Sequence, residues 1–127
     1  MTTVREVMST ELVTVDPATT MVGAAGQMAS AHVGSVLVIE SDTLAGILTE
    51  RDILRSLASS ASADAARVSP VSAWMSTAPE SIHPDAPAGE ALDRMLSGSF
   101  RHLPVMNGDT LVGVVSMRDL ARALSKS

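Results

Sequence analysis

The chain contains no cysteine, and this absence removes several kinds of chemistry at once. Without thiols the protein forms no disulfide bond, uses no thiolate as a nucleophile and binds no metal through sulfur. A chain without cysteine is compatible with a reducing compartment, and we therefore expect a cytoplasmic protein.

Aromatic residues are almost as scarce, with one Phe, one Trp and no Tyr. Apolar residues nevertheless make up 46% of the 127 positions, so the chain can bury a core of ordinary domain size. That core must be built mainly from Val, Leu, Ile, Ala and the eight Met residues.

The sequence also lacks an excess of positive charge and a long apolar run. The net charge is −5 and the pI is about 5.0, whereas a nucleic-acid-binding face is usually basic. No segment approaches the roughly 18 uncharged apolar residues of a spanning helix, and residues 1–8 do not resemble a signal peptide. The three histidines share no metal-site spacing. We therefore expect no nucleic-acid or membrane partner and no metal or other cofactor.

The chain does contain an internal repeat, at a constant offset of 67 residues. Aligning 4–55 with 71–122 gives 16 identities in 52 positions without a gap. Each copy, at about 55 residues, would be only marginally stable alone, so the two should share a core. We predict a first repeat at 1–60, a linker at 61–70 and a second repeat at 71–127.

Both copies carry the same order of predicted elements, which is strand, helix, strand, strand, helix. Apolar residues at helical spacing indicate the first helix, and paired apolar runs around a polar turn indicate a hairpin. The predicted ranges, first copy before second, are 13–15 and 81–82, 21–29 and 88–96, 36–39 and 103–106, 44–48 and 111–115, and 53–57 and 120–124. This order predicts an α+β fold.

A hydroxyl residue and an Asp three positions later stand before the last helix of each copy, as Thr49 and Asp52, then Ser116 and Asp119. This spacing is that of a capping box, in which the side chains satisfy the first helical N–H groups. The same groups can form an anion site at the helix start, with the carboxylate accepting hydrogen bonds from a ribose diol. Spacing alone leaves both interpretations open.

The copies differ before the third element. The second carries Arg101 and His102 where the first has Gly34 and Ser35. An Arg can hold a phosphate through two hydrogen bonds, and a protonated His adds charge. The alternative is a solvated Arg beside a His whose hydrogen bonds are satisfied at a strand edge.

Several segments together resemble a known family. They are VREVMST and VSAWMST, SVLVIESDTLAGILTERDIL and RHLPVMNGDTLVGVVSMRDL. They are similar to those of the tandem cystathionine β-synthase (CBS) domain pair, or Bateman module, of the stand-alone bacterial type. The resemblance implies two repeats packed with pseudo-two-fold symmetry and AMP, ADP, ATP or S-adenosylmethionine bound in clefts between them. It also implies a homodimer that signals to a separate effector protein.

The resemblance further implies that the Asp of each motif contacts ribose and the Thr or Ser contacts phosphate. For the second-repeat cleft we expect Arg101, His102, Ser116 and Asp119, completed by Thr14 and Val15 from the first repeat. For the first-repeat cleft we expect Thr49 and Asp52, with Ser81 and Ile82. The first-repeat cleft lacks the basic pair, so the second should bind phosphate better.

A non-catalytic nucleotide sensor is thus the leading hypothesis, and a dimerisation scaffold without ligand is the alternative. An enzyme ranks third, since the sequence pairs no nucleophile with a base and has neither a metal cluster nor a Walker loop.

Overall fold

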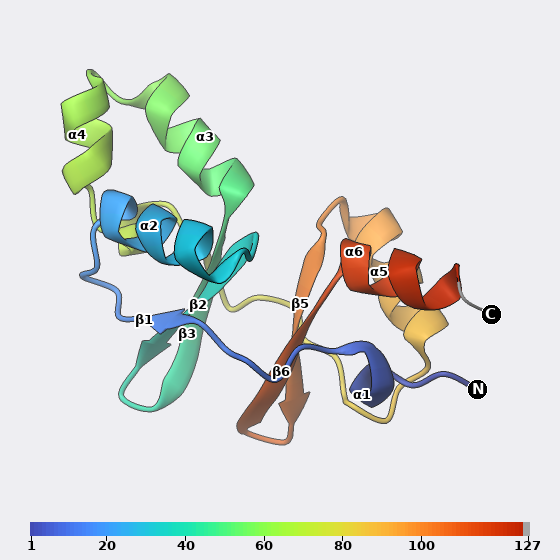
Figure 1. Cartoon of the computed structure of the whole chain (residues 1–127). Coiled ribbons are helices and arrows are strands. Elements are labelled where there is room, and N and C mark those ends of the chain that lie inside the picture. Colours follow the sequence, from blue (N-terminus) through green and yellow to red (C-terminus); the bar gives the residue numbers. More distant parts are fainter. Residues whose placement is uncertain (126–127) are drawn as a thin grey trace. The chain divides into compact units, whose positions relative to one another are not determined.

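The structure, a computed structural model, describes residues 1–125, which form two compact units. The terminal unit combines Met1–Leu12 with the chain from Pro79 on, and the central unit is Val13–Ala78. Both units contain helices and a β-hairpin in the expected order, which confirms the α+β class (Figure 1).

The central unit is built on a four-stranded sheet in the order β1-β2-β3-β4. Strand β1 (Thr14–Val15) runs parallel to β2 (Ser35–Glu40), which pairs antiparallel with β3 (Thr43–Thr49). Strand β4 (Ser76–Thr77) completes the sheet, antiparallel to β3. The β2–β3 turn places Ser41 and Asp42 at positive φ, a conformation typical of two-residue hairpin loops.

Three α-helices belong to the same unit: α2 (Met21–Ala31), α3 (Glu50–Ser59) and α4 (Ala63–Val68). Their buried faces pack with the sheet around a core in which Val36, Val38 and Leu48 are fully buried. Helix α4 and the 3₁₀ helix η1 (Val71–Ala73) follow α3 along the chain. Within the predicted linker 61–70, residues 63–68 form α4, in which Ala66 is buried.

The terminal unit repeats this plan with β5 (His102–Asn107), β6 (Thr110–Ser116), α5 (Ala88–Gly98) and α6 (Met117–Leu124). The hairpin pairs antiparallel, and Ile82 bridges to Val105 in the parallel sense. A core of Met95, Leu103, Val105, Val115 and Leu120 lies under both helices. The helix α1 (Val4–Val7), which the sequence analysis did not predict, buries Val4 in this core.

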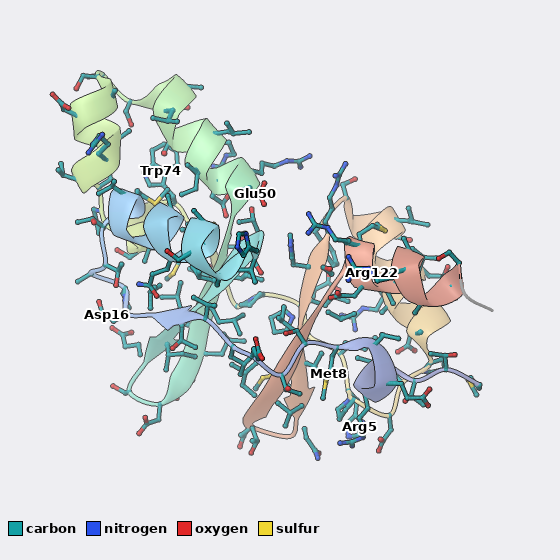
Figure 2. All side chains as sticks on the ribbon, in the orientation of Figure 1. Arg5, Met8, Asp16, Glu50, Trp74 and Arg122 are labelled. Carbon is teal, nitrogen blue, oxygen red and sulfur yellow. The ribbon has the colours of Figure 1, made fainter. Side chains whose placement is uncertain are left out.

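The two units do not coincide with the two sequence repeats, because the opening segment of each repeat joins the other hairpin. Ser9 exchanges two backbone hydrogen bonds with Val114 of β6, at 2.8 and 3.0 Å, and Met8 lies beside β6 (Figure 2). The equivalent Ser76 pairs with Ile47 of β3. Each repeat is therefore completed by residues from the other copy.

Glycine permits this close approach at both places. A Cβ on Gly113 would lie 2.7 Å from Met8 Sδ and 2.8 Å from the Ser9 carbonyl oxygen. A Cβ on Gly46 would meet the Ser76 carbonyl oxygen at 2.7 Å and Met75 Sδ at 2.8 Å. Both glycines are buried, so any side chain there must displace a strand. Within residues 1–125, no helix is long and apolar enough to cross a membrane.

Candidate functional site

The motif of the second repeat lies where β6 ends and α6 begins. The Asp119 N–H donates to Ser116 Oγ at 3.0 Å, and the Ser116 N–H donates to Asp119 Oδ2 at 2.9 Å. These reciprocal bonds form a capping box and hold both side chains at the helix start. Asp119 stays half-buried, and no Arg of the described chain forms an ion pair with it.

Arg101 and His102 are carried to the same place by β5. His102 is the cross-strand partner of Ser116, and the Arg101 carbonyl accepts the Met117 N–H at 2.8 Å. The backbone before β5 is thus bonded to the first turn of α6. The Arg101 side chain is exposed and makes no ion pair within residues 1–125. The structure therefore brings the backbone of Arg101 and His102 to the helix start at which the Ser116 and Asp119 side chains form the cap.

The motif of the first repeat has the same backbone frame at the junction of β3 and α3. The Thr49 N–H donates to Asp52 Oδ2 at 2.9 Å, and the Thr49 hydroxyl lies 3.2 Å from the same oxygen. The Gly34 carbonyl accepts the Glu50 N–H at 3.1 Å, as the Arg101 carbonyl accepts that of Met117. The two backbone frames match, and the side chains before the strand differ.

The predicted first strand of each repeat lies beside the hairpin of its own repeat, as strand β1 in the first repeat and as a single bridge at Ile82 in the second. Ile82 donates to the Pro104 carbonyl and accepts from the Met106 N–H, at 3.1 and 2.9 Å. The Ser81 carbonyl accepts from Arg94 Nη1 at 2.6 Å. Thr14 and Val15 pair with Leu37 and Val38 in the central unit.

The terminal unit thus contains six of the ten predicted residues, and the central unit contains the other four. The six are Ser81, Ile82, Arg101, His102, Ser116 and Asp119, and the four are Thr14, Val15, Thr49 and Asp52. Each predicted cleft combines residues of both units, so its composition stays a prediction.

Two residues at the first motif were not singled out by the sequence analysis. Arg55 Nη1 lies 2.8 Å from Asp52 Oδ1, and Arg55 Cζ lies 5.7 Å from the centroid of the Trp74 ring. The sequence held a signal for this difference, because Arg55 is repeated as Arg122 whereas Trp74 aligns with Val7. Figure 2 shows Trp74 in the central unit and Arg122 on α6.

The described residues include no group of three His, Asp or Glu side chains that could hold a metal ion. Every buried side-chain nitrogen or oxygen in residues 1–125 has a hydrogen-bond partner.

Comparison with known proteins identifies the same repeats. A family model described as the CBS domain matches residues 4–59 and 71–126. An uncharacterised 17.7 kDa protein of Acidianus ambivalens is 40% identical over 125 residues, covering 97% of this chain and 73% of that protein. The crystal structure of the CBS-domain protein ATU1752 from Agrobacterium tumefaciens superposes with a TM-score of 0.90 at 28% identity, covering 97% of this chain and 99% of that one.

Two similar structures contain adenosine compounds. CBSX2 was crystallised in complex with AMP and has a TM-score of 0.85 at 22% identity, covering 99% of this chain and 98% of that one. The CBS pair of MJ0100 was crystallised with 5′-methylthioadenosine and S-adenosylmethionine and has a TM-score of 0.89 at 20% identity, with the same coverage. At these identities the likeness concerns the fold.

Proposed function

The chain belongs to the CBS-domain family, and from this premise we propose that it is a regulatory module that binds an adenosine-containing nucleotide and signals to a separate effector protein. The observation that carries the proposal is the group formed by Arg101, His102, Ser116 and Asp119 at the start of α6. The complexes of CBSX2 with AMP and of MJ0100 with S-adenosylmethionine support this ligand class.

The chemistry of the group suits such a ligand. The exposed Arg101 guanidinium can hold a phosphate through two charge-assisted hydrogen bonds. The Asp119 carboxylate accepts one bond from the Ser116 N–H and has further lone pairs for a ribose diol. AMP, ADP and ATP offer both groups, whereas S-adenosylmethionine offers the ribose and no phosphate. We propose that these four residues bind the ligand and perform no catalytic step.

A homodimer is the second part of the proposal. Leu54 and Leu57 on α3 are 67% and 49% exposed, and Val68 on α4 is 69% exposed. Apolar side chains grouped on neighbouring helices gain free energy when a second surface covers them. A second copy of the chain would supply such a surface, as expected from the resemblance to dimeric CBS modules. A scaffold without a ligand is the alternative to the sensor, and it shares this surface.

Calorimetric titration with AMP, ADP, ATP and S-adenosylmethionine tests the sensor. We expect selective binding by the wild type, and Asp119→Ala and Arg101→Ala should each weaken it by roughly 10- to 100-fold, since each removes a charge-assisted hydrogen bond. Asp52→Ala is the matched control at the first motif and should have a much smaller effect. Protein freed of ligand that binds none of the four compounds would favour the scaffold instead.

A further inference from the structure

The two Asp residues of the repeated motif stand in different surroundings. Asp52 is 5% exposed, and its Oδ1 atom accepts a charge-assisted hydrogen bond from Arg55 at 2.8 Å while Oδ2 accepts the bonds of the helix cap. Asp119 uses Oδ2 for its cap in the same way, but it stays half-buried and Arg122 does not pair with it. One motif acid is thus covered by an arginine of its own helix, and the other is not.

The sequence explains why only one of the two equivalent arginines turns onto its acid. Arg55 and Arg122 occupy the same position, three residues after the Asp. Arg55 lies over the Trp74 ring, whose π face attracts a guanidinium at about this distance. The residue aligned with Trp74 in the other copy is Val7, which has no π face. Trp74 therefore positions Arg55 on Asp52, and Arg122 has no counterpart to hold it.

We propose that Arg55 restrains nucleotide binding at the first-repeat motif by occupying Asp52 in place of the ribose hydroxyls of a ligand. The proposal rests on the sensor function above and concerns the difference between its two motifs. A diol that approaches the nearly buried Asp52 competes with Arg55 for Oδ1, so the guanidinium must move aside for the diol to bind. No such displacement is needed at Asp119. The second-repeat motif consequently fills first, and Arg55 with Trp74 sets how much more ligand the first motif requires.

The difference between Gly34-Ser35 and Arg101-His102 acts in the same direction, so the experiment must separate the two causes. The separation is possible because the Arg55 side chain is 56% exposed and contacts Asp52 through Oδ1, whereas the helix cap uses Oδ2. If the first-repeat motif binds nucleotide weakly because it lacks the basic pair, removing Arg55 will not improve its affinity. If it binds weakly because Arg55 covers the Asp52 carboxylate, removing Arg55 will improve its affinity.

The test measures AMP binding by calorimetry in an Asp119→Ala background, where the first motif is the remaining one. Adding Arg55→Ala should tighten AMP binding by about tenfold, because a partly exposed charge-assisted bond no longer has to be broken. Trp74→Val should also tighten AMP binding, because Arg55 is no longer held over Asp52. Arg122→Ala, the matched control, should change nothing, and Asp52→Ala should abolish the gain. Circular dichroism verifies that each variant is folded.

The outcomes distinguish this inference from the sensor function. If the wild type binds AMP through Asp119 and Arg55→Ala changes nothing, the inference is overturned while the sensor stands. An equal gain from Arg122→Ala, or a gain that survives Asp52→Ala, also overturns it. If the wild type binds no adenosine compound and Arg55→Ala creates an Asp52-dependent site, the inference stands and the second-repeat site fails. Binding by neither protein overturns both.

Discussion

Replacing Gly113 with Ala tests whether the exchange of opening segments depends on a bare backbone in β6. The new Cβ would lie 2.7 Å from Met8 Sδ and 2.8 Å from the Ser9 carbonyl oxygen. Both distances are shorter than a Cβ normally keeps from a sulfur or oxygen atom. The Met8 side chain can rotate away. The Ser9 carbonyl cannot move alone, because it accepts the Val114 N–H at 3.0 Å while the Ser9 N–H donates to the Val114 carbonyl at 2.8 Å.

The expected cost follows from these contacts. Overpacking of this kind costs about 1–3 kcal/mol, and separating Ser9 from β6 instead would forfeit two hydrogen bonds worth about 1 kcal/mol each. Alanine also restricts the unfolded chain, which returns about 0.4–1 kcal/mol. With this return subtracted, the free energy of unfolding should fall by up to about 2.5 kcal/mol in the Gly113→Ala variant. Gly46→Ala should behave alike, because its Cβ would meet the Ser76 carbonyl oxygen at 2.7 Å.

Urea unfolding followed by far-ultraviolet circular dichroism measures this change, with Gly26→Ala as the matched control. Gly26 lies within α2, and apart from its chain neighbours and the backbone of its own helix no atom would lie within 4 Å of a Cβ there. Its replacement should stabilise the protein by up to about 1 kcal/mol, the helix propensity difference. Adding Met8→Ala to Gly113→Ala should restore only part of the loss, since the carbonyl contact remains. If Gly113→Ala were as stable as Gly26→Ala, the argument from close approach would be refuted.

The remaining predictions concern the helix cap and the assembly. Ser116→Ala removes the acceptor of the Asp119 N–H and should lower the free energy of unfolding by about 1 kcal/mol. Ser116→Thr keeps a hydroxyl and should lower the free energy of unfolding less. Equal losses in both variants would argue against a capping role. For the homodimer, light scattering of the wild type should give twice the chain mass, and Leu54→Asp should give the monomer mass because it places a charge on the exposed face of α3. A wild type that stays monomeric at high concentration would contradict the dimer.

The sequence alone determined the repeat, the α+β class and the order of the elements. This was possible because each of these follows from local patterns: apolar spacing for α2 and α5, and turn residues at 40–42 and 107–109 for the hairpins. The capping boxes were also readable, since Thr49 with Asp52 and Ser116 with Asp119 act within one helical turn. Family resemblance added the expected ligand class, which local patterns could not supply.

Tertiary structure decided which residues complete each unit. The exchange of Met8 and Ser9 onto β6 depends on a close approach between segments about a hundred residues apart in the sequence, and no local pattern encodes it. The structure likewise decided that Arg55 covers Asp52, because the cation is positioned by Trp74, which stands outside its helix. The two repeats carry the same Arg and Asp, but Arg55 lies over the Trp74 ring and pairs with Asp52, so the surroundings of the two acids differ.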